Sequence, residues 1–75
     1  MMQTYKNSLG NSNVEAYSIG TNYIDVRFQD GSIYRYSYQS TGMYKVEQMK
    51  KLAIRGYGLN SYIMNEAKKD YEYKY

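Results

Sequence analysis

Two runs of alternating residues, joined by an Asp-Gly pair, constrain the fold of this chain more than any other feature. The first run places three apolar residues on one face: Ile24, Val26 and Phe28. The second run places three tyrosines on one face: Tyr34, Tyr36 and Tyr38. Strict alternation over several residues is typical of a half-buried strand, and Asp-Gly between two such runs favours a tight hairpin. We therefore predict an antiparallel hairpin over residues 23–38.

Two registers of this hairpin compete, and a slip by one residue would exchange the faces of a strand. A two-residue loop sets Arg35 across from Val26 on the core side. A three-residue loop, with Gly31 in the left-handed conformation, pairs Val26 with Tyr34 and Asp25 with Arg35. Burying an unpaired charge costs several kcal/mol, whereas a cross-strand ion pair contributes at most ~1 kcal/mol. We therefore predict the three-residue loop, with the tyrosines of the second strand mainly in the core.

The rest of the chain supplies a further strand and two helices. Residues 14–19 are predicted to form the first strand, followed by a turn at residues 20–22. The pattern then becomes helical, with an apolar stripe at Val46, Met49 and Ala53. Gly56 is predicted to end this helix. A second helix is expected from about Asn60 to about Lys69, with apolar positions at Tyr62, Ile63 and Ala67.

The predicted fold is therefore α+β, a three-stranded antiparallel meander followed by two short helices packed on one face. A chain of 75 residues has room for one modest core, so residues 1–75 are expected to form a single domain. Residues 1–12, rich in Asn, Ser and Gly near their end, are expected to be a loose lead-in. Residues 70–75 are compatible with an edge strand, a helical extension or a frayed end.

The composition excludes several kinds of chemistry. The chain has no cysteine and no histidine, so thiolate and imidazole groups can serve neither as metal ligands nor as nucleophiles. The carboxylates are scattered over strand, turn and helices, with no spacing that pairs them. We therefore expect no catalytic residue, no metal and no cofactor, and a protein that is not an enzyme. No apolar run approaches a membrane span, and the absence of cysteine favours a reducing cytoplasm.

Charge and aromatic content point to binding. The formal net charge is only +3, but residues 43–69 carry six lysines and arginines against two glutamates. A basic segment can attract phosphate backbones or acidic proteins. Twelve of the 75 residues are tyrosine, a side chain that suits both the rim of a small core and an interaction surface.

Three stretches carry a resemblance to a known family. Residues 24–36 read IDVRFQDGSIYRY, residues 43–52 read MYKVEQMKKL, and residues 56–63 read GYGLNSYI. With this strand, Asp-Gly turn, central Tyr-x-Tyr motif, helix and closing Gly, Asn and Ile pattern, the chain resembles the KTSC family. That short domain is named after the C-terminus of some lysyl-tRNA synthetases and also occurs as a stand-alone protein in bacteria and their phages.

The resemblance covers roughly residues 12–63 and implies a fold more than a function. It implies structural roles for seven residues: Phe28, Gly31, Tyr34, Tyr36, Gly56, Asn60 and Ile63. Family members commonly have Val-Pro before the helix, where this chain has Gln-Ser-Thr-Gly, and residues 64–75 replace the usual short basic end. The family has no established activity. Its occurrence at the C-terminus of some lysyl-tRNA synthetases suggests RNA binding.

Two groups of residues are candidates for binding. The first lies on the solvent face of the hairpin: Tyr23, Arg27 and Arg35. The second gathers at the end of the first helix: Lys50, Lys51, Arg55 and Tyr57. Basic side chains beside exposed rings can hold phosphates and stack on bases. The plainer interpretations are a solvated sheet face with an Asp25–Arg35 ion pair, and a helix end whose cations complement the dipole.

The sequence thus predicts a non-catalytic binding domain with nucleic acid, RNA among the options, as its first candidate partner. The alternative is a protein-binding module: a phage-encoded inhibitor of an acidic host protein, or a homo-oligomerising domain. An edge strand at residues 71–75 would favour this alternative, because exposed edges accept strands from other chains. A nucleotide-sized ligand is a third option, although so small a core leaves little room for a deep pocket.

Overall fold

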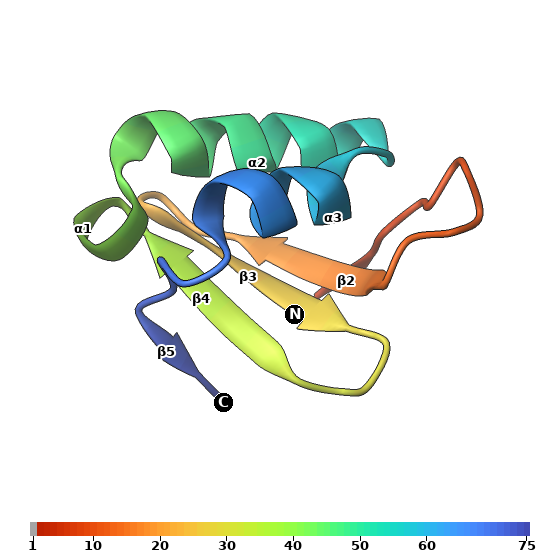
Figure 1. Ribbon diagram of the computed structural model, residues 1–75, viewed down its shortest axis with the longest axis horizontal. Helices are drawn as coiled ribbons and strands as arrows, with labels where there is room; N and C mark the ends of the chain where they lie inside the picture. The colour runs from red at the N-terminus through yellow and green to blue at the C-terminus, as the bar shows by residue number, and fades with distance from the viewer. Residues whose placement is uncertain (1) are drawn as a thin grey trace.

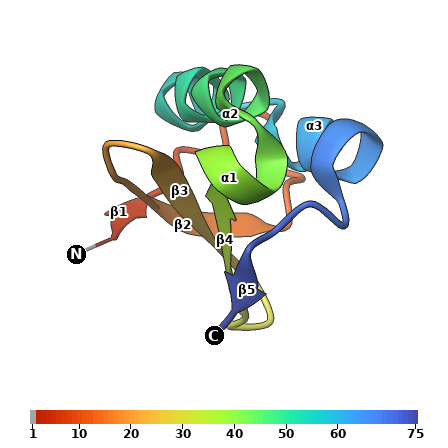
Figure 2. The same ribbon diagram turned by 90° about the vertical axis from the view of Figure 1, so that its left-hand side faces the viewer.

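A sheet of five antiparallel strands forms one layer of the molecule, in the order in which the strands occur along the chain. The computed structural model describes residues 2–75. The strands are β1 (Gln3–Thr4), β2 (Val14–Ile19), β3 (Tyr23–Phe28), β4 (Ile33–Ser37) and β5 (Tyr73–Lys74). The helices are α1 (Tyr38–Thr41), α2 (Met43–Arg55), α3 (Leu59–Tyr62) and the π-helix η1 (Ile63–Ala67). Figures 1 and 2 show that the helices lie on one side of the sheet, so the α+β class is confirmed.

The β3–β4 hairpin has the predicted register. Val26 pairs with Tyr34, and Asp25 pairs with Arg35. The N–H of Phe28 donates to the carbonyl of Ser32 over 2.9 Å, which closes a three-residue loop. Gly31 in that loop has a φ of 90°, in the left-handed region that favours glycine. The three-residue loop and the predicted pairing of the two strands are therefore confirmed.

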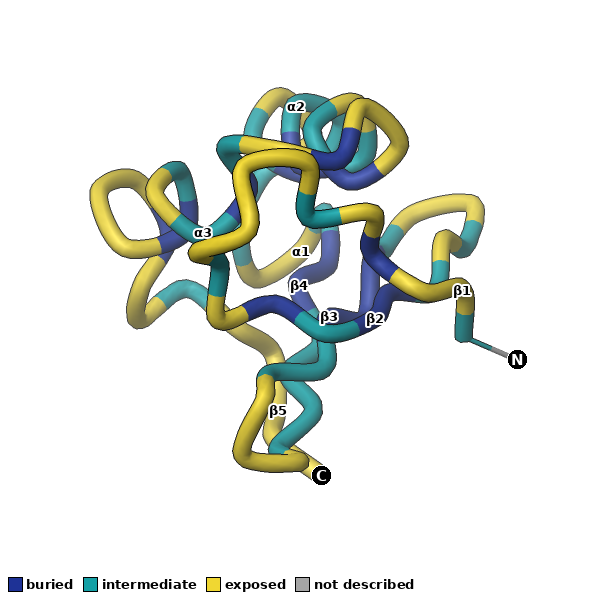
Figure 3. Tube along the Cα trace, turned by 90° about the vertical axis from the view of Figure 1, so that its right-hand side faces the viewer, coloured by how far each residue is buried: buried dark blue, intermediate teal, exposed yellow. Residues whose placement is uncertain are grey.

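The core lies between α2 and the sheet, where Figure 3 shows the buried residues gathered. The stripe of α2 is buried at its three predicted positions: Val46, Met49 and Ala53. Tyr36 is 1% exposed and belongs to the core, as predicted. Tyr34 and Phe28 are half-buried and pack against the core from the side. The prediction for the tyrosines is therefore confirmed for Tyr36 and only in part for Tyr34.

The end of α2 follows the glycine prediction. Gly56 takes a left-handed φ of 90°, and its N–H donates to the carbonyl of Leu52. This geometry is common where a helix ends, because glycine has no Cβ to clash there. The start of the helical region differs from the strand pattern, since Tyr38 leaves the sheet and begins α1.

The predicted number of strands was wrong, because each end of the chain adds a short edge strand. The lead-in contributes β1, and Tyr5 beside it is 3% exposed, with its hydroxyl accepting the N–H of Leu59 over 3.3 Å. The tail contributes β5, so the edge-strand option for residues 70–75 is the one observed. Both strands have two residues; β1 is too short to show alternation, and the alternation of tyrosines with charges over residues 71–75 left an edge strand as one of three options. Only their partners in the folded sheet define them.

Candidate binding groove

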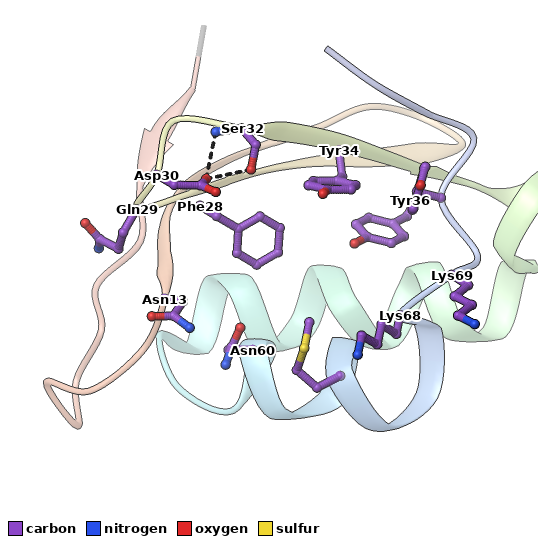
Figure 4. A pocket seen from close by; sticks show the side chains of 12 residues that line it. Asn13, Phe28, Gln29, Asp30, Ser32, Tyr34, Tyr36, Asn60, Lys68 and Lys69 are labelled. Atoms are coloured by element: carbon purple, nitrogen blue, oxygen red, sulfur yellow. Dashed lines mark hydrogen bonds between the residues drawn. The ribbon is translucent and has the colours of Figure 1, made fainter.

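A groove of about 590 Å³ opens between the helix-facing side of the β3–β4 hairpin and the segment formed by α3 and η1. Figure 4 shows its lining, in which the rings of Phe28, Tyr34 and Tyr36 project from the strands toward the helices. The α3–η1 side supplies Asn60, Met64, Lys68 and Lys69, and the tail supplies Tyr71. The groove thus lies where the hairpin extends past the helical cover of the core.

Four aromatic rings form one wall of the groove. Tyr34 lies at their centre, with its ring centroid 5.6 Å from that of Phe28 and 4.8 Å from that of Tyr71, both in edge-to-face contact. Tyr36 stacks beside it with centroids 6.4 Å apart. Edge-to-face contacts between aromatic rings are favourable, and here they hold the rings in fixed orientations. The wall is therefore a preformed, partly exposed aromatic surface.

Lysines surround this wall without carboxylate partners. Lys68 and Lys69 directly follow η1 and line the groove. The ammonium of Lys74, on β5, lies 5.4 Å from the centroid of the Tyr34 ring. Within residues 2–75, none of these three lysines forms an ion pair. The charges of Lys68 and Lys69 therefore remain available to an anionic ligand, whereas the charge of Lys74 also acts on Asp30 and helps to lower the pKa of that carboxylate.

The one carboxylate that lines the groove is held by its own hairpin. Asp30 accepts hydrogen bonds from the hydroxyl of Ser32 over 2.7 Å and from its N–H over 3.0 Å. These bonds, the hydroxyl first, lower the pKa of Asp30 below its usual value. The residues that line the groove thus include two lysines, Lys68 and Lys69, against this one carboxylate, which gives the lining a small positive charge.

Amide side chains line the end of the groove away from the lysines. Figure 4 shows Asn13 and Asn60 near the ring of Phe28, and Gln29 near the same end. The carbonyl of Asn13 accepts the N–H of Gln29 over 2.8 Å, which ties the backbone before β2 to the hairpin. In the described part of the chain none of the three amide groups hydrogen-bonds to another residue. Their donors and acceptors face the groove or solvent.

The predicted binding group at the end of α2 is partly occupied by contacts within the chain. The ammonium of Lys50 donates to Glu47 over 2.8 Å and to the carbonyl of Thr21 over 3.0 Å. The guanidinium of Arg55 lies 3.9 Å from the Tyr57 ring centroid, so these two residues are brought together as a stacked pair. Lys51 is exposed. Lys50 is thus held by contacts within the chain, unlike Lys51, and it is not part of the stacked pair of Arg55 and Tyr57.

The predicted group on the hairpin lies on the open face of the sheet, opposite the helices, and its charges are paired. Arg35 donates two hydrogen bonds to Asp25, over 2.8 and 3.0 Å, and its guanidinium lies 3.8 Å from the Tyr23 ring centroid. Arg27 contacts Glu15 over 3.3 Å. The structure therefore brings Tyr23 and Arg35 together, but as a self-contained stack rather than as free groups. The Asp25–Arg35 ion pair of the plainer interpretation is observed, but Asp25 is buried, so this part of the face is not solvated as that interpretation expected.

Sequence reasoning missed most of the groove. Its missed residues include Asn13 before the first predicted strand, Gln29 in the hairpin loop, Met64, Lys68 and Lys69 in the predicted second helix, and Tyr71 in the tail, with Lys74 beside the groove. The only available signal was the basic excess that includes Lys68 and Lys69. A π-helix is rare and is frequent at functional sites, and η1 immediately precedes these lysines. No pattern in residues 63–67 predicts it, because the apolar spacing also fits an α-helix.

Among residues 2–75, no cluster of three or more carboxylates could hold a metal ion. In the same range, no helix combines the length and the apolar character needed to cross a membrane. Comparisons with models of known protein families, with curated protein sequences and with solved structures found no match in any of the three. The resemblance to the KTSC family therefore stays a prediction.

Proposed function

We propose that this domain binds single-stranded nucleic acid, RNA included, without catalysing a reaction, and that the groove is its main contact. The observation that carries the proposal is the combination of an aromatic wall with three lysines that have no carboxylate partner. Stacking of a base on an aromatic side chain contributes ~1–3 kcal/mol, and each lysine on a phosphate adds salt-dependent affinity.

The shape of the groove favours single strands over duplexes. In a duplex the bases are stacked inside and cannot reach a ring at the bottom of a groove. An unpaired base can turn outward and enter one, as happens in most sequence-specific RNA recognition. The rings of Phe28, Tyr34 and Tyr71 are held by one another, so binding would require little reordering of the protein.

In this proposal, the basic residues predicted from the sequence contribute less to binding than the groove lysines do. Arg27 and Arg35 would have to leave their carboxylates before they could contact a phosphate. Lys51, Arg55 and Tyr57 have no such restraint from a carboxylate, and they would extend the contact as a secondary site. The informative comparison is therefore between the affinity of a variant without the groove lysines and that of a variant without the cations at the end of α2.

A titration with two charge-matched variants tests the proposal. The first variant removes Lys68, Lys69 and Lys74, and the second removes Lys50, Lys51 and Arg55, each by substitution with alanine. Fluorescence anisotropy with labelled single-stranded RNA and with duplex DNA, at low and moderate salt, should show tighter binding of the single strand. The groove variant should lower the log–log salt slope by about 2, as expected for about three lost contacts at ~0.7 each.

Two results would refute the proposal. The first is that the parent protein binds neither nucleic acid even at low salt, where nonspecific contacts are strongest. The second is that both variants lose affinity equally, because only net charge would then matter. Tyr34→Ala offers a further check, since it should weaken binding of single strands more than of duplexes.

A second candidate function, recognition of a protein by strand addition, is favoured by β5. This two-residue strand forms an exposed edge of the sheet, carrying Tyr73 and followed by Tyr75. Exposed edges can accept a strand from a second copy or from a host protein. The test is a pull-down from lysate with and without nuclease, together with the oligomeric state by size-exclusion chromatography. Partners retained after nuclease treatment, or a stable oligomer, would favour this candidate over nucleic acid.

A further inference from the structure

Two tyrosine rings at the C-terminal end of the sheet lie against each other on the open face, beside the guanidinium of Arg35. The ring centroids of Tyr73 and Tyr75 are 5.1 Å apart, the ring planes are inclined by 25°, and the hydroxyl oxygens are 3.3 Å apart. Side chains two residues apart in an extended segment point to the same face, so the backbone itself aligns the two rings. Tyr73 is 39% exposed and Tyr75 is 56% exposed, so both rings are accessible to a reagent in solvent.

We infer that Tyr73 and Tyr75 form a site of oxidative cross-linking, at which hydrogen peroxide and a one-electron peroxidase join the two rings as dityrosine. The site lies on the open face, so it is independent of the proposed function, which concerns the groove. The product contains a carbon–carbon bond between ring carbons that neighbour the two hydroxyl groups. Since the hydroxyl oxygens are already 3.3 Å apart, these carbons lie close together, and coupling within the chain requires no encounter between two molecules.

The reaction balances with hydrogen peroxide as the oxidant. Each phenol gives up one electron and its hydroxyl proton, which leaves two neutral tyrosyl radicals whose unpaired electrons extend onto the ring carbons ortho to the oxygen. One such carbon of each ring forms the new bond. The hydrogen on each of these carbons then moves to its oxygen as a proton, which restores both phenols. The two electrons and two protons that the rings have lost convert the peroxide into water.

The carboxylate of Asp25 is placed to accept the proton that Tyr75 loses. The hydroxyl of Tyr75 donates to Oδ2 of Asp25 over 3.2 Å, which is within the reach of a general base. Loss of an electron makes a phenol strongly acidic, so the carboxylate can take this proton although Arg35 also donates to it. We therefore expect Tyr75 to be oxidised first, with Tyr73 as its coupling partner.

The other tyrosine pairs are less suited to this reaction. Within residues 2–75, every other ring–ring contact between tyrosines includes Tyr34 or Tyr36. Tyr36 is 1% exposed, and the half-buried Tyr34 meets Tyr71 edge to face, with the planes inclined by 78°. The chain contains no cysteine and no tryptophan, two side chains that give up an electron readily. The oxidation of aromatic groups is therefore directed to the exposed tyrosines.

The experiment treats the parent protein with a haem peroxidase and hydrogen peroxide, followed by trypsin digestion and mass spectrometry. Trypsin cleaves after Lys69 and Lys74, so it separates Tyr75 from the peptide 70–74 unless the two are cross-linked. The expected product is that peptide joined to Tyr75, with the mass of two hydrogen atoms lost, and it should show the blue fluorescence of dityrosine. Oxidation of methionine adds oxygen instead, so mass distinguishes it from cross-linking.

Variants of the tail test which rings react. Tyr73→Phe should remove the cross-linked product, and so should Tyr75→Phe. The matched control is Tyr71→Phe, which changes a tyrosine of the same tryptic peptide whose ring lies on the groove side, and it should retain the product. Asp25→Asn, checked by circular dichroism to be folded, should form the product more slowly, because the carboxylate that accepts the proton is gone.

A second measurement tests whether the cross-link forms in the folded chain. The N–H of Tyr75 donates to the carbonyl of Ile33, and joining the rings should slow its hydrogen exchange in the purified product. Two results would overturn the inference: peroxidase treatment that gives only oxidised methionine or cross-links between chains, and a product that persists in Tyr73→Phe. In the second case Tyr71 would be the partner, and the stacked pair would not be the site.

Discussion

The groove and the open face of the sheet contain the same kinds of residues in opposite states. On the open face, Arg35 is bonded to Asp25 and stacked on Tyr23, and the hydroxyl of Tyr75 donates to the same carboxylate over 3.2 Å. In the groove, Lys68 and Lys69 have no carboxylate partner within residues 2–75. Tyrosines and cations thus stabilise the fold on one side and remain available on the other.

The difference shows that residue type alone does not identify a binding surface. A cation that is already paired must lose one partner before it gains another, so its net contribution to binding is small. An unpaired cation loses only water. The contacts on the open face therefore mainly hold the C-terminal strand in place. A ligand would add its contacts on the other side, in the groove. Four predictions test this contrast through stability.

The largest expected effect is at Tyr36, where the groove wall meets the core. Tyr36→Ala should lower the free energy of unfolding by about 3–5 kcal/mol, because a large ring that is 1% exposed would leave a cavity. Tyr34→Ala should cost clearly less, since that ring is half-buried. Chemical denaturation measures both, with Tyr36→Phe as the control that keeps the ring. A loss below about 1 kcal/mol for Tyr36→Ala would place its ring outside the core.

The next effect concerns the Asp25–Arg35 ion pair on the open face. Asp25→Asn should lower the free energy of unfolding by about 1.5–3 kcal/mol, because it removes charge-assisted hydrogen bonds and leaves the Arg35 charge partly buried. Denaturation of the single variants and of Asp25→Asn/Arg35→Gln forms a double-mutant cycle. Additive losses in that cycle would contradict the pairing.

A smaller effect is expected at Gly31, in the loop that sets the faces of both strands. Gly31→Val should cost ~1–2 kcal/mol, since φ is 90° and a Cβ there would meet no neighbouring atom, which leaves backbone strain alone. Gly31→Asn should cost less, because asparagine tolerates the left-handed region better. Thermal unfolding measures both variants. If valine and asparagine melt at the same temperature as glycine, the loop does not have this conformation.

The smallest effect is the pH response of Asp30 at the rim of the groove. Its folded pKa lies below the usual value of 3.8, so the stability it contributes is present above that pH and is lost as the pH falls through the folded pKa. Ser32→Ala removes the hydroxyl that contributes most, and should raise the pKa of Asp30 toward 3.8. NMR titration of the carboxylate measures this shift. An unchanged pKa in Ser32→Ala would show that the hydroxyl does not bond to Asp30.

The elements with many residues could be predicted from the sequence, and the short ones could not. The alternation of residues and the cost of burying an unpaired Arg35 predicted the β3–β4 register. The apolar stripe predicted α2. The strand β1 has too few residues for a pattern, and the alternation in the tail left β5 as one of three options. The pairing of both strands depends on edges that exist only in the folded sheet. The predicted binding residues are cations near tyrosines, and sequence spacing does not show which cations form an ion pair with a carboxylate.

By itself, the sequence determined the α+β class, the two faces of the hairpin, the helix that covers one face and the absence of thiol and imidazole chemistry. These follow from local periodicity, glycine conformation and composition, which act over a few residues. Only the tertiary structure decided that residues 13, 60, 68, 69 and 71 meet the aromatic rings of the hairpin around one groove. It also decided that Arg35 is paired while Lys68 is not. Both depend on contacts between segments far apart in the chain, which the packing of the core brings together.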